Sequence, residues 1–196
     1  MKNLTTLLLA ILIGLTLIGC DDTKKVVGEE ESAVAGEYRP ANKEGYDRIE
    51  TTGILELINE QRVYGATCGE RGYFAPTTPL EPLEALEDTA YAKAVNLIEY
   101  QVFSHALQGA LKETYDNVFN LIRSGLSRNT NKSGENIAGG QVTDAEVVKA
   151  WMKSDGHCAN IMDPMYDHVG ITHVYEHNSK YHHYYVQHFI ATITYR

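Results

Sequence analysis

The spacing of the apolar residues changes once along this chain of 196 residues, and that change limits the possible folds more than any other feature. Before Asp163-Pro164, apolar side chains recur every three or four residues, which predicts amphipathic helices. After it, the runs 169–175 and 185–195 alternate between two faces, which predicts two strands joined by a turn. Helices followed by an antiparallel pair of strands are typical of an α+β fold, in which helices pack on a sheet.

Four apolar stripes carry the helical spacing, and we interpret each as the core-facing side of a helix. They are Ile54–Gln61, ended by Gly65; Leu83–Ile98, with Pro82 in the first turn; Tyr115–Ile122, ended by Gly125; and Thr143–Trp151, in which Thr143 and Glu146 form a capping box. With 43% hydrophobic residues the chain can build one core of ordinary size, which excludes a wholly disordered protein.

The first twenty residues, MKNLTTLLLAILIGLTLIGC, are expected to be a targeting segment rather than part of the fold. A positive Lys2 precedes an apolar run, Leu7–Ile18, that is too short to span about 30 Å of hydrocarbon comfortably. The run ends in LIGC, which resembles a bacterial lipobox. The resemblance implies that residues 1–19 are removed as a signal peptide and that Cys20 is lipidated. The alternative is an ordinary signal peptide with an incidental cysteine.

Residues 20–45 are expected to form a lipidated start and an acidic linker, and residues 46–196 the folded domain. The segment after Cys20 has a run of three glutamates and little to bury. The whole chain has a net charge of -9, which argues against nucleic acid as a partner and against electrostatic adhesion to anionic lipid. The predicted partner is therefore a membrane reached through the N-terminal lipid anchor, facing the periplasm or the cell exterior.

Four segments in the domain resemble, in order and spacing, the motifs of the CAP superfamily of cysteine-rich secretory, antigen five and pathogenesis-related proteins. The segments are Phe103–His105, Gly134–Ala138, Trp151–Met162 and Tyr184–Phe189. The resemblance covers about residues 50–196 and is greatest to bacterial lipoprotein members. It implies a three-layer α-β-α sandwich with an antiparallel sheet flanked by helices.

The resemblance also implies a cleft, which members of the family line with two histidines and two glutamates. His105, Glu135 and His157 match three of these positions, and Ser154 stands at the position of the second glutamate. The last of the four segments, Tyr184–Phe189, also departs from the family pattern. Tyr185 stands where a tryptophan is usual, and Ile190, directly after the segment, stands where a glycine is usual. These departures weaken any transfer of metal or lipid binding from animal members.

Two imidazoles and a carboxylate suit zinc or another divalent cation, and His105, His157 and Glu135 could just supply the three ligands of an open site. The alternative is a polar cleft without metal, in which Glu135 orients a histidine by hydrogen bonding. The residues alone leave both interpretations open.

Catalysis has less support than binding. Ser104 and Ser154 do not lie in a nucleophile elbow, and Cys158 directly follows His157, so the two side chains should point apart. Once Cys20 carries lipid, an oxidising compartment favours a disulfide between Cys68 and Cys158, with two buried free thiols as the alternative. We expect no reaction through Cys158.

Five of the eight histidines fall within sixteen positions near the C-terminus, namely His173, His177, His182, His183 and His188. We interpret them as solvated histidines at strand ends, with incidental metal binding or acid sensing as the alternative.

The sequence therefore predicts a lipid-anchored, extracytoplasmic CAP-domain protein that binds an unknown small ligand or lipid in a cleft formed by His105, Glu135, Ser154 and His157. A metal-assisted, peptidase-like hydrolase of the cell envelope would use the same residues. A structural or adhesion protein would use its surface instead.

Lipidation is tested by mass spectrometry of the mature N-terminus. We expect a chain that starts at Cys20 and carries acyl chains, because the cysteine follows a short apolar run at the depth of a lipobox. A Cys20→Ser variant should lose the added mass and its membrane association. An unmodified wild-type chain that starts beyond residue 20 would contradict the prediction.

Overall fold

The computed structural model describes residues 46–126 and 130–193, so Cys20 and the expected linker lie outside the described residues. In chain order the elements are β1 (Asp47–Ile49), α1 (Thr52–Tyr64), β2 (Ala66–Thr67), the 3-10 helix η1 (Gly69–Arg71), β3 (Tyr73–Phe74), β4 (Glu81–Pro82), α2 (Glu84–Tyr100), α3 (Gly109–Tyr115), α4 (Val118–Ser124), β5 (Thr130–Gly139), α5 (Asp144–Lys153), α6 (Asp155–Met162), β6 (His168–Tyr175) and β7 (His183–Thr192). Among these, no helix combines the length and apolar character needed to cross a membrane.

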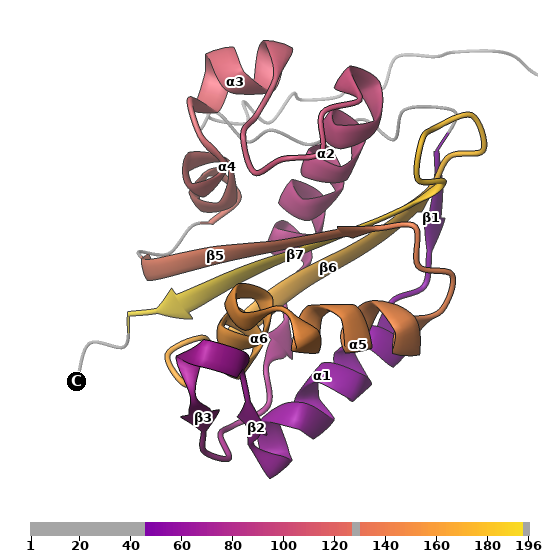
Figure 1. Ribbon diagram of the computed structural model, residues 1–196. Coiled ribbons are helices and arrows are strands. Elements are labelled where there is room, and N and C mark those ends of the chain that lie inside the picture. Colours follow the sequence, from indigo (N-terminus) through magenta and orange to yellow (C-terminus); the bar gives the residue numbers. More distant parts are fainter. Residues whose placement is uncertain (1–45, 127–129, 194–196) are drawn as a thin grey trace, which may run out of the picture. The chain divides into compact units, whose positions relative to one another are not determined.

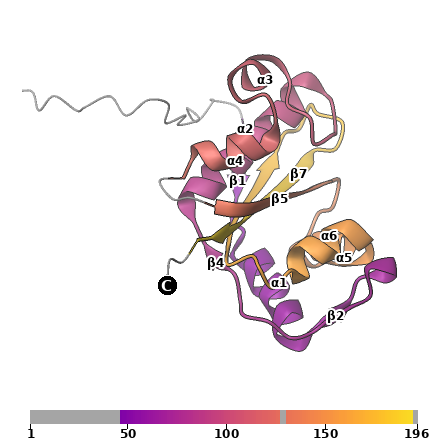
Figure 2. The same cartoon turned by 90° about the vertical axis from the view of Figure 1, so that its left-hand side faces the viewer.

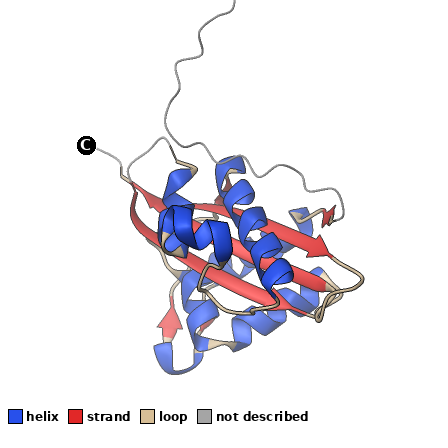
Figure 3. Ribbon diagram, turned by 90° about the horizontal axis from the view of Figure 1, so that it is seen from above, coloured by secondary structure: helices blue, strands red, loops and turns tan. Residues whose placement is uncertain are grey.

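The domain has three layers, with a mainly antiparallel sheet in the order β1-β6-β7-β5 between two groups of helices. Figure 1 shows α2, α3 and α4 above the sheet and α1, α5 and α6 below it, and Figure 2 shows the same layers from the side. Seen from above in Figure 3, the strands run beneath the upper helices. The α+β prediction and the three-layer arrangement are therefore confirmed.

Strand β7 divides the core into its two halves, because successive side chains point to opposite faces. Tyr185 and Phe189 face α1, α5 and α6 and pack with Trp151. Val186 and Ile190 face the other layer, where they pack with α2 and α4. Cross-strand pairing then places β5 beside β7, with β5 at the edge of the sheet.

The predicted helices and strands are found, but α6 was not predicted, Phe119 of the third stripe is exposed rather than core-facing, and there are three further differences. The third stripe forms two helices, α3 and α4, because Asp116 has a φ of 62° and the Asn117 side chain caps α4 by accepting from the Asn120 amide at 3.0 Å. Pro82 lies in β4, before α2, rather than in its first turn. Strand β5 had no apolar pattern to reveal it, since Ile137 is its only large apolar residue.

Gly170 in the middle of β6 sets how closely α2 approaches the sheet. A Cβ at this position would lie 2.1 Å from the main-chain carbon of Leu86 and 2.2 Å from the amide nitrogen of Glu87. The register pairs Gly170 with His188 of β7. The absent side chain therefore lets α2 pack its backbone against the sheet at the point where His188 lies.

A Gly170→Ala variant should be destabilised by about 3 kcal/mol, because a new methyl group would press on helix backbone that cannot rotate away. Urea unfolding measures this. Gly156→Ala is the matched control: a Cβ there meets nothing within 4 Å, so its stability should change by less than about 1 kcal/mol. Equal stability of the two variants would contradict the close packing of α2.

Candidate functional site

A cleft of about 620 Å³ opens beside edge strand β5, between the two helical layers. It is lined by Arg71, Phe74, His105, Glu135, Ser154, Gly156, His157, Ala159, Asn160 and Asp163. The structure therefore brings His105, Glu135, Ser154 and His157 to one cleft, although they come from three separate parts of the chain.

Glu135 is the buried centre of this cleft, with only 2% of its side chain exposed. Its Oε1 accepts a hydrogen bond from His105 Nδ1 at 2.6 Å, and its Oε2 accepts one from His188 Nε2 at 3.1 Å. Burial alone would raise the pKa of Glu135, but these two hydrogen bonds and the charges of His188 and Lys93 lower it. Glu135 is thus a buried carboxylate that orients the ring of His105.

Lys93 holds the loop that carries His105. This fully buried side chain of α2 donates from Nζ to the carbonyls of Ser104 at 2.7 Å and Ala106 at 2.9 Å, one on each side of His105. Burial lowers the Lys93 pKa, while the nearby charge of Glu135 raises it. The ammonium group therefore both fixes the loop and balances the buried carboxylate.

His188 is a site residue that the sequence did not reveal. It is fully buried, opposite Glu135 in the β5–β7 register, and its Nδ1 lies 2.8 Å from Thr89 Oγ1. The Thr89 hydroxyl also lies 3.0 Å from the Leu86 carbonyl, to which it donates, so this contact ties His188 to the first turn of α2. The resemblance of Tyr184–Phe189 to a family motif was the signal that pointed to this segment. Its pairing with Glu135 depends on the register with β5, a strand that has no apolar pattern by which it could be predicted.

His157 and Ser154 lie on the α5–α6 side of the cleft. The main-chain oxygen of His157 accepts from Asn136 Nδ2 at 3.1 Å, and Asn160 Nδ2 donates to Asn136 Oδ1 at 2.9 Å. Burial, and then the nearby His105, lower the pKa of His157, so its imidazole is neutral near pH 7. The Ser154 hydroxyl makes no hydrogen bond within the described part of the chain.

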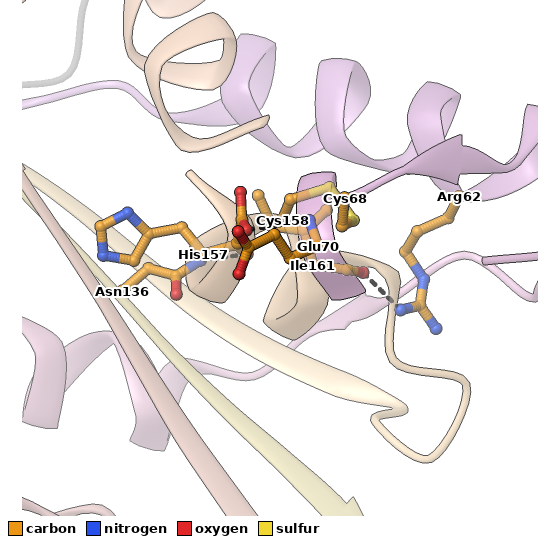
Figure 4. Close-up of a disulfide and its surroundings, with 8 residues drawn as sticks. Arg62, Cys68, Glu70, Asn136, His157, Cys158 and Ile161 are labelled. Atoms are coloured by element: carbon orange, nitrogen blue, oxygen red, sulfur yellow. Dashed lines mark hydrogen bonds between the residues drawn. A yellow bond between two sulfur atoms is a disulfide. The ribbon is translucent and has the colours of Figure 1, made fainter. Parts of the chain in front are cut away.

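The predicted disulfide is confirmed: Cys68 and Cys158 are bonded, with their Cα atoms 5.3 Å apart. Figure 4 shows His157 beside Asn136 and pointing away from the disulfide. The two cysteines are 90 positions apart, and a loop of that length corresponds to about 4–5 kcal/mol of stabilisation in the chain-entropy model. The bond also removes Cys158 as a nucleophile and ties η1 to α6.

The residues do not fit a three-ligand metal centre. Among the residues that the structure describes, no group of three or more His, Cys, Asp or Glu side chains is placed to hold a metal ion. Both oxygens of Glu135 already accept from histidines, which leaves two imidazoles, His105 and His157, where an open zinc site needs three protein ligands.

The C-terminal histidines do not form one surface cluster, which corrects that interpretation. His188 belongs to the cleft, and His173 is only 3% exposed. His173 stacks on Tyr185 with ring centres 4.0 Å apart, and its Nε2 lies 2.9 Å from His183 Nδ1. Of the five, only His177 and His182 are exposed near the turn between β6 and β7, as the prediction of solvated strand-end histidines requires.

The model of the CAP family, described as the cysteine-rich secretory protein family, matches residues 55–189. This range covers most of the chain, from α1 to β7, and includes all of the cleft residues described above. The chain therefore belongs to the CAP family.

One relative is an uncharacterized protein of Bacillus subtilis (strain 168), YkwD, which is 41% identical over 153 residues. The match covers 78% of this chain and 55% of YkwD, so the chain spans about half the length of that relative.

Two solved structures show the same fold. An outer surface protein from Borrelia burgdorferi has a TM-score of 0.58 at 20% identity, over 75% of this chain and 98% of that one. An extracellular protein containing a SCP domain from Bacillus anthracis str. Ames has a TM-score of 0.53 at 18% identity, over 71% and 39% of the two chains.

His173 should make the stability depend on pH. Burial, and then the charge of His183, lower its pKa from 6.5 to about 4, so between these values the unfolded chain binds more protons than the folded one. The contribution of neutral His173 to the free energy of unfolding is fully present above about pH 6.5. It is lost as the pH falls below that value, by about 1.4 kcal/mol per pH unit. A His173→Phe variant, measured by urea unfolding from about pH 7 to 5, should flatten the dependence by that amount. His177→Gln is the exposed control, and an equal flattening in it would contradict the assignment.

Proposed function

We propose that this chain is a lipid-anchored, extracytoplasmic binding protein whose ligand contacts His105 and His157 in the cleft beside β5. The observation that carries the proposal is the pairing of a buried carboxylate with an accessible imidazole. Glu135 has 2% of its side chain exposed, whereas His105, bonded to it at 2.6 Å, has 58% exposed. A buried polar group held this firmly restricts the ring to one orientation.

That orientation defines the chemistry offered to a ligand. Because Nδ1–H of His105 donates to Glu135, the neutral ring presents Nε2 as a hydrogen-bond acceptor. His157 supplies a second imidazole in the same cleft, and burial keeps that ring neutral near pH 7 by lowering its pKa. Such a site suits ligands that carry N–H or O–H donors, and its few polar groups would fix the orientation of the bound molecule.

The location rests on the N-terminal segment and on the relatives. The LIGC motif after a short apolar run supports lipidation of Cys20. A disulfide between Cys68 and Cys158 is stable in an oxidising compartment. The outer-surface and extracellular proteins that share the fold agree with a position outside the cytoplasm.

A two-dimensional NMR screen of the full chain with small hydroxyl- and amide-bearing fragments, and separately with zinc chloride, tests the proposal. We expect fragment hits to shift the signals of His105, His157 and Asn160. The shifts should be lost in a His105→Gln, His157→Gln double variant and kept in His177→Gln.

Hits that gather instead in the groove between α1 and α5, lined by Leu57, Val148 and Met152, would contradict the proposed site. Zinc should bind weakly and less at lower pH, because two imidazoles are its ligands and protonation blocks both. Tight zinc binding that survives the double variant would place a metal site elsewhere.

A further inference from the structure

The charges around the cleft cancel in pairs, except for one. Glu135 is balanced by the buried ammonium of Lys93, and the Asp163 carboxylate, on the cleft wall, is paired with Lys132 Nζ. The lining histidine His157 is neutral near pH 7. Arg71 remains as a cation with no side-chain partner among the described residues. The cleft of a chain with a net charge of -9 therefore carries a local positive charge.

The backbone that carries Arg71 is fixed in place. Its amide donates to the carbonyl of Cys68 at 3.0 Å, and Cys68 is bonded to Cys158 of α6. The amide of Glu70, the residue before Arg71, donates to Asp155 Oδ2 at 2.9 Å and so docks η1 on the start of α6. Glu70 and Asp155 are neighbours of Arg71 but do not line the cleft. The backbone of Arg71 is thus fixed on the cleft wall that also carries His157, while its side chain is exposed to solvent.

We propose, on the basis of the function proposed above, that the ligand is a short peptide with a free C-terminal carboxylate. Arg71 binds the carboxylate, and His105 Nε2 accepts a hydrogen bond from a peptide N–H. Phe74 and Ala159, which also line the cleft, offer apolar contact to a side chain of the ligand. A cleft of about 620 Å³ is in the range of small-molecule sites.

A carboxylate fits this site better than a phosphate. A guanidinium group matches the planar carboxylate with two parallel hydrogen bonds and neutralises its single charge. A phosphate carries more charge and is usually bound by several cations or by helix N-termini. In the described cleft Arg71 is the one cation without a counter-charge, and the remaining polar groups are the two imidazoles, Ser154 and Asn160.

The test is a titration of the full chain with Ala-Ala-Phe, followed by NMR signals of His105, His157 and the Arg71 Nε–H. The C-terminal amide of the same peptide is the matched ligand, and inorganic phosphate is the competing anion. We expect the acid to bind about tenfold more tightly than the amide, since the amide lacks the charge-assisted pair. We also expect phosphate to compete only weakly.

Arg71→Gln should lower the affinity for the acid about tenfold and leave the affinity for the amide unchanged. Arg123→Gln removes the same charge from an exposed position of α4 outside the cleft and should change neither. Equal binding of acid and amide, no effect of Arg71→Gln, strong competition by phosphate, or no shift of any cleft signal would each overturn the peptide assignment. If fragments still bind at His105 and His157 in the screen above, the proposed function stands although this inference fails.

Discussion

The buried carboxylate of Glu135 is the interaction on which the rest of the site depends. A charge with 2% of its side chain exposed is costly unless it is paired and hydrogen-bonded. Here one helix, one loop and one strand supply the partners, because Lys93, His105 and His188 all converge on it. The same requirement explains the close approach of α2, since Gly170 leaves the room in which Thr89 reaches His188.

A second buried charge fixes the opposite wall. Arg62 of α1 is fully buried, and its guanidinium group donates to the carbonyls of Thr78, Ile161, Asp163 and Tyr166 at 2.7–3.0 Å. These carbonyls belong to the segment before β4, to the end of α6 and to the turn into β6. Burial lowers the pKa of Arg62, and the nearby Asp163 opposes this shift. Figure 4 shows Arg62 reaching toward Ile161, with the Cys68–Cys158 disulfide nearby. The helix that carries His157 is therefore held in its middle by the disulfide and at its end by Arg62.

The parts of the fold that could be predicted are those in which side-chain pattern and local structure agree. The apolar stripe of α2 reflects burial against the sheet, the capping box at Thr143 reflects hydrogen bonding at the start of α5, and the alternation in β7 reflects side chains that pack on two different helical layers. Strand β5 exists because β7 pairs with it, and its sequence TNKSGENIAG carries almost no apolar signal. Since Glu135 lies on β5, neither its contact with His188 nor the role of Lys93 could be derived from spacing. The motifs gave the cleft residues by resemblance, whereas the partners that orient them needed the register and the loop contacts.

The departure at Ser154 determines the charge of the cleft. In the wider family that the chain resembles, this position holds a second glutamate, whereas serine is usual in the bacterial members, and Ser154 lines the same cleft as Arg71 and His157. A carboxylate there would add a negative charge to a cleft in which Arg71 is the one cation without a counter-charge among the described residues. With serine the wall keeps the positive charge of Arg71, while Glu135 remains neutralised behind His105. One short side chain thus leaves on this wall a positive charge that a glutamate would offset, within the same arrangement of helices and strands.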